Sequence, residues 1–529
     1  MLIKLIIIFY FISIKFVNSL LKFNNNIPNL NNNLSIVCTE NGCVKGAKGI
    51  NYQDITFFKG IPYASPPINE LRWKEPQKVN KWNNILDCTN YGSQCPQPTG
   101  NGIIGSEDCL YLNIFTPTTT LLNKNFIIKP SLLLPVYVWI HPGGFSVDSS
   151  SNPIFDGEYL SSKGIVYVSI NYRIGALDQI YALNWIKRNI EEFGGDSNQI
   201  TIGGQSAGAA SVYLLALSPL TSNLFKGVIS ESGGDMHPRD PQSMYIWHDT
   251  VEEAEQKSEQ FLLKKNISNQ ITAKQLRQLP LNIIIEPNII IDNDNTRNTW
   301  FGNPVLFHPI LDNYVIKHKY EETLEKGLQN KINILIGYTF DEFGASPSRT
   351  FTLDQYKNNL TNIYGNFSDE FFNLYPANES TASSVANNAI REMTRISSNQ
   401  WANLWLKNSD LNVFQYVWNH APPGFEYTLG AFHTSDIIYF LNTLYMIKET
   451  NWSEKDKQIA NIMSCYILNF IKTFDPNGQN LPKWEKQKYD QNTVMEVGDD
   501  FKQIPLVNNG DLQKKINFLK EFWSTQIAM

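Results

Sequence analysis

The sequence predicts an α/β protein with a large, mostly parallel central sheet that helices cover on both faces. Apolar runs of strand length, among them residues 164–172, 199–204 and 226–230, alternate with polar or amphipathic segments. This alternation is typical of parallel strands that are joined by helices. One covering helix is indicated between the first two runs, where apolar residues recur at helical spacing. These residues are Ile180, Leu183, Ile186, Ile190 and Phe193.

Length and charge narrow the class of protein. The chain has 529 residues, a formal net charge of −6 and 18% charged residues, so neither nucleic acid nor an anionic membrane surface is favoured as a partner. Length alone would suit roughly three or four domains. The candidate catalytic residues described below nevertheless extend from position 206 to position 433, and they can cooperate only within one fold. We therefore expect a single domain over residues 35–529.

The first 34 residues have the pattern of an exported chain. Lys4 precedes a mostly apolar stretch that ends in the small-residue cleavage context Val17-Asn18-Ser19, so residues 1–19 are predicted to be a signal peptide. The stretch is shorter than the ~20 residues of a membrane-spanning helix and is interrupted by a lysine. Residues 20–34 form an Asn-rich linker. We expect secretion, or location in a secretory-pathway lumen, without a stable membrane span.

The motif around Ser206 predicts a catalytic nucleophile. Ser206 stands in a G-x-S-x-G frame between a β-type run and a small-residue helical run, which is the pattern of a nucleophile elbow. Gly204 and Gly208 fit that turn, because a strand that becomes a helix within about two residues leaves no room for side chains there. The N–H group of Ala207 would then face a developing oxyanion. The alternative is a glycine-rich turn without catalytic meaning.

A glycine loop upstream predicts the rest of an oxyanion hole. Residues 136–140 read as a buried strand that runs into His141-Pro142-Gly143-Gly144, similar to the HGGG-type loop of esterases and lipases. We expect the N–H groups of Gly143 and Gly144 to bind the oxyanion, since glycine lets the main chain approach closely. Pro142 contributes no N–H group. The alternative is an ordinary β-turn.

Candidates for the acid and the base follow the serine along the chain. Residues 332–338 read as a buried strand, and Asp341 and Glu342 come just after its carboxyl end, where open α/β sheets place functional groups. The pattern alone does not choose between these adjacent carboxylates. His433 is the candidate base, and His420 is its nearer competitor.

These residues belong to a longer series of motifs. In their content and order they resemble the type B carboxylesterase and cholinesterase family, and this resemblance implies an α/β-hydrolase fold. The matching blocks are FKGIPYA at 58–64, SEDCLYLN at 106–113, VSINYR at 168–173, FGGD at 193–196, the Ser206 elbow, FHPILD at 307–312, Asp341-Glu342 and GAFH at 430–433.

The resemblance assigns roles to particular residues. In this family the second carboxylate of the acidic pair is the triad acid and the histidine of the G-A-x-H block is the base, which implies Glu342 and His433 here. A small-molecule or lipid-like ester is the implied substrate, without a cofactor. Also implied are oxyanion donors at Gly143, Gly144 and Ala207, a disulfide between Cys95 and Cys109, and the ion pairs Arg72–Glu107 and Arg173–Asp196.

Three departures from the family limit what the resemblance implies. After Gly175 and Ala176 the chain passes directly to Leu177, where relatives have a further segment of very roughly twenty residues. Either the connection is short, as βα loops often are, or coding sequence has been lost from the gene model, and a real shortening would weaken folding or activity. Gln205 replaces a glutamate, which disfavours cationic substrates. The Cys95–Cys109 loop has no tryptophan, so choline esters are disfavoured as well.

The chain has six cysteines, which suits an oxidising compartment. Cys38 and Cys43 flank an Asn-Gly turn that would bring their side chains within bonding reach, so a second disulfide is expected there. Cys88 and Cys465 remain, and the helical pattern around Cys465 predicts a buried free thiol. The sequence has no metal-ligand spacing. Candidate glycosylation sites are Asn33, Asn266, Asn359, Asn366, Asn378 and Asn451.

The sequence as a whole predicts a secreted serine carboxylesterase that hydrolyses carboxylic esters through an acyl-enzyme intermediate, with no cofactor and no metal. The rival hypothesis is a catalytically impaired, cholinesterase-like adhesion or recognition protein. Relatives of that kind typically lose the serine, whereas Ser206, Glu342 and His433 are all retained. The sequence does not indicate the preferred acyl and alcohol groups or the oligomeric state.

Overall fold

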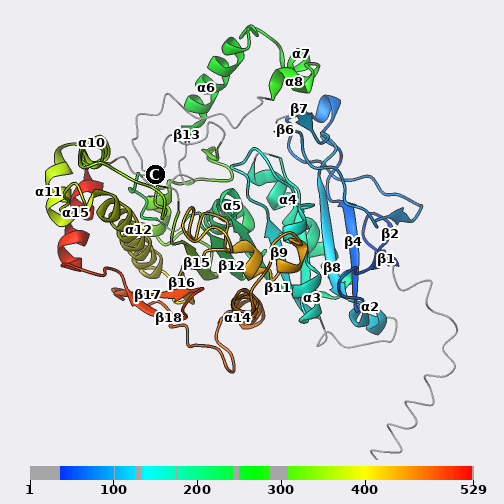
Figure 1. Ribbon diagram of the computed structural model, residues 1–529. Helices are drawn as coiled ribbons and strands as arrows, with labels where there is room; N and C mark the ends of the chain where they lie inside the picture. The colour runs from blue at the N-terminus through cyan, green and yellow to red at the C-terminus, as the bar shows by residue number, and fades with distance from the viewer. Residues whose placement is uncertain are drawn as a thin grey trace, which may run out of the picture.

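The computed structural model describes residues 36–99, 102–124, 133–173, 175–234, 236–241, 249–285, 308–342 and 344–526. At its centre is an 11-stranded sheet in the order β18-β17-β16-β15-β12-β11-β9-β10-β8-β4-β3 (Figure 1). Its strands are β3 (Ala47–Lys48), β4 (Ile55–Pro62), β8 (Tyr111–Pro117), β9 (Leu134–Ile140), β10 (Val166–Ile170), β11 (Gly195–Gln205), β12 (Gly227–Glu231), β15 (Asn333–Thr339), β16 (Val413–Trp418), β17 (Thr493–Val497) and β18 (Lys502–Pro505).

The sheet is parallel through its centre and antiparallel at both edges. Every neighbouring pair from β17 to β10 is parallel. The outer strands β18, β8, β4 and β3 pair antiparallel. The predicted α/β class is therefore confirmed, with a mixed sheet rather than a purely parallel one. The predicted runs 136–140, 164–172, 199–204, 226–230 and 332–338 correspond to β9, β10, β11, β12 and β15.

Alternate side chains of the central strands enter two different cores, which is why these strands are apolar throughout. In β9, Val136, Val138 and Ile140 pack on one face, in the core that contains residues of α4 (Ala176–Asn189) and α5 (Ala207–Leu217). Tyr137 and Trp139 pack on the other face, with residues of α3 (Glu158–Ser162) and α14 (Glu454–Thr473).

The remaining helices lie around these layers, and α6, α7 and α8 stand together beyond one end of the sheet (Figure 1). No residue of α6, α7 or α8 is buried. The bounds of these and the other helices are α2 (Thr118–Lys124), α6 (Val251–Lys264), α7 (Ala273–Arg277), α8 (Leu281–Ile284), α9 (Tyr320–Glu325), α10 (Leu353–Tyr364), α11 (Ser368–Leu374), α12 (Ala382–Leu406), α13 (Ile437–Phe440) and α15 (Leu512–Ser524).

The predicted apolar stripe after Arg173 forms as expected. Ile180, Leu183 and Ile186 are buried on α4, and the stripe continues through a short 3-10 turn at Ile190–Phe193. All of these side chains belong to the core on the α4 and α5 face of the sheet.

Two disulfides are present, and both join the cysteines named from the sequence. Cys38 and Cys43 close the hairpin of β1 (Ile36–Cys38) and β2 (Cys43–Lys45), and Cys95 bonds to Cys109. The two free cysteines differ in exposure. Cys88 is buried, and burial raises the pKa of its thiol to about 12.

The prediction of a buried thiol at Cys465 is wrong. Cys465 is exposed, whereas its neighbours Met463, Tyr466 and Ile467 on α14 are buried. Asn461 and Asn469 lie one helical turn before and after Cys465, so polar residues at helical spacing already marked this side of α14 as the one that faces solvent.

The predicted ion pair between Arg173 and Asp196 is also wrong, whereas the Arg72–Glu107 pair is present at 2.5 Å. Both carboxylate oxygens of Asp178 lie 2.7 Å from nitrogens of the Arg173 guanidinium. Because the chain is short after Gly175, Asp178 falls in the first turn of α4, directly beside Arg173. The nearer carboxylate therefore takes the place of the distant one.

Several predictions about export concern residues beyond the described ranges. The signal peptide at 1–19, the linker at 20–34 and the Asn33 site all lie outside them. Of the other candidate glycosylation sites, Asn359 is half-buried and Asn266, Asn366, Asn378 and Asn451 are exposed. Over the residues that the structure describes, no helix has both the length and the apolarity to span a bilayer.

Candidate active site

Ser206 lies in the sharp turn between β11 and α5. Its φ of 56° is in the left-handed region, which a residue with a side chain adopts only under local constraint. Its N–H group donates to the carbonyl of Glu231 at 2.9 Å, and its carbonyl accepts from Ala210 at 2.8 Å. The Ser206 side chain stands at the N-cap of α5 but makes no capping hydrogen bond. The turn therefore holds the serine backbone while the hydroxyl is not used to cap the helix.

The glycines on either side of Ser206 are required by close packing. A Cβ at Gly204 would lie 2.6 Å from backbone atoms of Gly208 and Ile140, and a Cβ at Gly208 would lie 2.1 Å from the Ile140 carbonyl oxygen. The first turn of α5 thus packs directly against the carboxyl end of β9. This packing leaves no room for side chains at positions 204 and 208, as the G-x-S-x-G motif predicted.

Glu342 and His433 form the second part of the site. Oε2 of Glu342 lies 2.6 Å from Nδ1 of His433, and the other carboxylate oxygen accepts the N–H group of Thr339 at 3.0 Å. The exposed fractions of the two side chains are only 11% and 13%. Burial raises the pKa of Glu342, but the charge and hydrogen bond of His433 outweigh it and hold that pKa below its ordinary value.

Asp341, the other carboxylate of the acidic pair, faces away from His433. One of its oxygens pairs with the guanidinium of Arg391, and the other accepts the N–H group of Ala431 at 2.9 Å. A Cβ at Gly430 would lie 2.0 Å from that second oxygen. Asp341 therefore binds the backbone of the G-A-x-H block, while Glu342 contacts the histidine of the block.

The residue before the serine contacts the far side of the imidazole. Nε2 of Gln205 lies 3.3 Å from Nε2 of His433, and Gln205 is fully buried. An amide nitrogen can only donate, so this contact needs a lone pair on Nε2 of the ring. The contact to Glu342 needs a proton on Nδ1. Both neighbours thus favour the same tautomer, whose Nε2 can accept a proton.

The glycine loop packs against the start of the helix that follows Ser206. Gly143 and Gly144 have φ angles of 115° and 57°, and the carbonyl of Gly143 accepts the N–H groups of two later residues of the loop. Phe145 packs in a small cluster with Ala207 and Ala210. This contact brings the three predicted oxyanion donors, Gly143, Gly144 and Ala207, to neighbouring positions.

Two further carboxyl groups are buried close to this site. Glu231 pairs in register with Gln205 on the neighbouring strand, and neither of its carboxylate oxygens has a hydrogen-bond partner in the described part of the chain. Burial, and then the charge of Asp436, raises the pKa of Glu231 well above its ordinary value. Burial, and then the charge of Glu342, raises the pKa of Asp436 to about 7.

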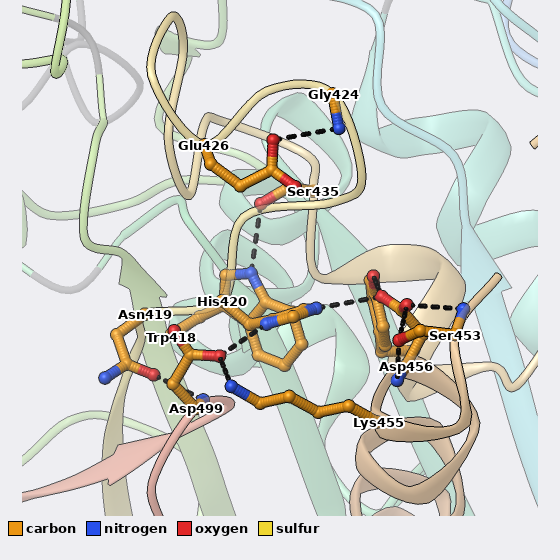
Figure 2. A network of polar contacts seen from close by, with 11 residues as sticks. Trp418, Asn419, His420, Gly424, Glu426, Ser435, Ser453, Lys455, Asp456 and Asp499 are labelled. Atoms are coloured by element: carbon orange, nitrogen blue, oxygen red, sulfur yellow. Dashed lines mark hydrogen bonds and ion pairs between the residues drawn. The ribbon is translucent and has the colours of Figure 1, made fainter. Parts of the chain in front are cut away.

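His420, the competing candidate base, is occupied on both ring nitrogens. Nδ1 lies 2.7 Å from Asp499 and Nε2 lies 3.0 Å from Asp456 (Figure 2). A base needs a nitrogen lone pair that can take a proton from the nucleophile. The structure therefore favours His433 over His420.

A cavity of about 870 Å³ lies beside the glycine loop. Its wall includes Phe145 from that loop, Leu177 from the first turn of α4, and Phe261 and Leu276 from α6 and α7. This volume is in the range of small-molecule binding sites. In the part of the chain that the structure describes, no group of three or more metal-ligating side chains could hold a metal ion.

Sequence reasoning missed two residues that organise the site. Phe145 directly follows the glycine motif and had no role assigned to it, yet its side chain joins the glycine loop to α5. Arg391 was not identified, because it lies on α12, 50 residues from Asp341, and belongs to no motif. The only signal in the sequence was a second carboxylate beside Glu342, because such a carboxylate needs a cation as its partner when it is buried.

The sheet, the strained serine turn at the end of β11 and the histidine–glutamate pair after β16 and β15 define an α/β-hydrolase. Comparison with known proteins makes the assignment more specific. Residues 33–519 match the carboxylesterase family, and the chain belongs to this family. It is accordingly a carboxylic ester hydrolase.

Its relatives are esterases from distant sources. The para-nitrobenzyl esterase of Bacillus subtilis is 28% identical over 491 residues, which cover 85% of this chain and 93% of the relative. Liver carboxylesterase 1 of Oryctolagus cuniculus is 26% identical over 554 residues, covering 90% of each chain. A solved structure of a PNB esterase superposes with a TM-score of 0.73 at 26% identity, covering 91% of this chain and 99% of that one.

Proposed function

We propose that this protein is a serine carboxylesterase that acts on small-molecule carboxylic esters by two-step acyl transfer. Ser206 is the nucleophile, His433 is the general base and Glu342 orients the base. The observation that carries the proposal is the 2.6 Å contact between Nδ1 of His433 and Oε2 of Glu342. Only a ring that donates from Nδ1 presents a lone pair on Nε2 for the serine proton.

The proposed reaction begins when His433 accepts the proton of the Ser206 hydroxyl and the oxygen attacks the ester carbonyl. The N–H groups of Gly143, Gly144 and Ala207 bind the resulting oxyanion. The C–O bond to the alcohol then breaks, and the alcohol leaves with the proton from His433. In the second step His433 takes a proton from water as the water oxygen attacks the acyl carbon. The bond to Oγ of Ser206 then breaks, His433 returns the proton to Oγ, and the acid leaves.

Two features support an uncharged ester with an apolar group as the substrate. The cavity beside the glycine loop has apolar walls that include Leu177 and Phe261. Gln205 places a neutral amide next to the base, where a carboxylate would have attracted a cationic substrate.

A fluorophosphonate probe and one substitution test the proposal. We expect stoichiometric covalent labelling of the wild-type protein, with loss of both labelling and para-nitrophenyl acetate hydrolysis in Ser206→Ala. Ser211→Ala is the matched control, because Ser211 is a buried serine of the same helix, one turn beyond the elbow. Turnover above background in Ser206→Ala would rule out this nucleophile.

The same experiment separates the enzyme from the rival adhesion or recognition protein. A chain that folds normally but resists the probe would favour the non-catalytic role. The retained contact between His433 and Glu342 favours the enzyme, since a binding protein has no need of this buried pair.

We further propose that the folded part is one secreted or lumenal, glycosylated domain. The two disulfides suit an oxidising compartment, and one sheet joins strands from residue 47 to residue 505. A single cooperative unfolding transition and a mobility shift on glycosidase treatment of the exported protein are expected. Two separated transitions, or no shift, would count against these points.

A further inference from the structure

His420 lies between two carboxylates that come from different parts of the fold. It follows β16 by two residues and is 7% exposed. Its Nδ1 lies 2.7 Å from Oδ1 of Asp499, in the turn between β17 and β18, and its Nε2 lies 3.0 Å from Oδ1 of Asp456 on α14 (Figure 2). A single ring therefore bridges the end of one strand, one helix and one turn.

Both contacts can be hydrogen bonds only if the ring is protonated. A neutral imidazole has one N–H group, so one of its nitrogens would direct a lone pair at a carboxylate oxygen. The imidazolium donates to both carboxylates at once. Burial lowers the pKa of His420, but the hydrogen bonds and charges of Asp499 and Asp456 outweigh it and raise that pKa above its ordinary value.

Asp456 connects this ring to the helix that follows His433 in the chain. Its Oδ2 accepts the N–H and hydroxyl groups of Ser453, which caps α14. Its Oδ1, the oxygen that contacts His420, also accepts the hydroxyl of Tyr439 at 2.7 Å. Tyr439 belongs to α13, the short helix that begins four residues after His433.

Trp418 provides a second connection to the same segment. Its Nε1 donates to Oγ of Ser435 at 3.0 Å (Figure 2), and Ser435 is two residues from His433. The Trp418 ring also packs against Tyr439 with ring centroids 4.9 Å apart, and it lies edge-on to His420 at 5.8 Å. Trp418, at the end of β16, thus contacts the segment 433–440 through both Ser435 and Tyr439.

Several elements that pack around His420 contribute charged side chains. Asp499 is half-exposed and also pairs with Lys455 of α14 at 2.8 Å. The hydrogen bond of His420, together with Lys455, holds the pKa of Asp499 at about 2. The titratable and charged groups of this neighbourhood are Asp456 and Lys455 on α14, Tyr439 on α13, Asp499 in the turn, Glu496 on β17, Lys502 on β18 and Glu426 in the loop before His433.

We propose that His420 is a positioning residue: as an imidazolium it ties α14 and the β17–β18 turn to the segment that carries His433, and loss of its proton loosens that segment and lowers esterase activity at alkaline pH. The effect on activity rests on the proposed function. The stabilisation is complete below the ordinary histidine pKa of about 6.5 and is lost as the pH rises through the raised pKa of His420.

The first experiment is a histidine-labelled NMR titration of the full chain, with the His420 signal assigned by its loss in His420→Gln. We expect His420 to titrate above about 6.5, and Asp499→Asn to lower its midpoint by about one pH unit. Asp500→Asn is the matched control, because Asp500 is the next residue and pairs with Lys502 instead. A His420 midpoint below that of an ordinary histidine would overturn the proposal.

The second experiment asks whether residues 433–440, the segment that carries His433, loosen when His420 loses its proton. In wild type, kcat/KM for para-nitrophenyl acetate should fall on the alkaline side at the NMR midpoint, and hydrogen exchange of residues 433–440, corrected for intrinsic rates, should rise there relative to β16. Both changes should move about one pH unit lower in Asp499→Asn, with activity at pH 6 unchanged. If hydrogen exchange of residues 433–440 does not follow the His420 midpoint, the proposed positioning role of His420 is refuted. If hydrogen exchange follows the His420 midpoint but the protein has no esterase activity, the proposed function is refuted instead.

Discussion

Gln205 and Glu342 contact the two opposite nitrogens of the His433 ring, at 3.3 Å and 2.6 Å respectively. The amide can only donate to Nε2, and the carboxylate can only accept from Nδ1. Gln205, which precedes the proposed nucleophile, therefore helps to select the tautomer that a general base needs.

The first prediction concerns this amide. Gln205→Glu would place a carboxylate beside Nε2, which favours a proton on that nitrogen. We expect the rising limb of the pH profile of kcat/KM to move upward by about one pH unit, so that activity at pH 6 falls about tenfold. Gln415→Glu, also buried but bonded to Ser398, controls for the cost of a buried charge. An unmoved limb in Gln205→Glu would contradict the role of the amide.

The second prediction concerns Glu342, the carboxylate proposed to orient the base. Glu342→Gln offers an amide to Nδ1, and an amide donor favours the wrong tautomer there. We expect kcat to fall about 10³- to 10⁴-fold with little change in KM. Steady-state kinetics with a short ester would measure both parameters. A loss below tenfold would mean that Glu342 does not orient the base.

The third prediction concerns Asp341, the neighbour of Glu342. Asp341→Asn removes the charge that pairs with Arg391 and leaves a largely buried guanidinium without its partner. We expect the free energy of unfolding in urea to fall by about 3 kcal/mol, while kcat at low temperature changes far less than in Glu342→Gln. A large loss of kcat in a fully stable variant would contradict this division of roles.

The fourth prediction concerns the glycine loop. A Cβ at Gly143 would lie 2.0 Å from the carbonyl oxygen of Val147, so Gly143→Ala must displace the loop that carries the proposed oxyanion donors. We expect kcat to fall by about 10²- to 10³-fold. Gly102→Ala is the control, because Gly102 has a similar φ of 121° but open space around it. Equal effects in both variants would mean that backbone strain, and not loop displacement, is responsible.

The fifth prediction concerns the pH dependence of stability. Burial raises the pKa of Asp436 to about 7, against about 3.9 in the unfolded chain. The folded state therefore holds this proton more tightly, and the group lowers the free energy of unfolding as the pH rises from about 4 to about 7. Asp436→Asn should lack this decline, which amounts to about 4 kcal/mol at most. Urea unfolding at pH 4 and pH 8 would measure it, and parallel losses in both proteins would contradict it.

The sequence predicted those parts of the fold that local sterics and periodicity determine. Gly204 and Gly208 had to be glycines because α5 starts against the end of β9. The strands were recognisable because both of their faces are buried. The pairing of Cys38 with Cys43 followed from a turn between them.

Other features depend on which elements become neighbours, and local patterns do not carry that information. Asp341 and Glu342 are adjacent, yet only packing against Arg391 and His433 distinguishes their directions. The two partners of His420 come from positions 456 and 499, and no motif connects them to it.

The pairing of Arg173 with Asp178 also bears on how this protein acquires its structure. A partner five residues away can be met as soon as the first turn of α4 exists, whereas a partner at position 196 would require the chain to return from the far end of the helix. Contacts of short sequence separation cost little loop entropy and can form early. The pairing thus gives α4 an anchor that is independent of the completed sheet.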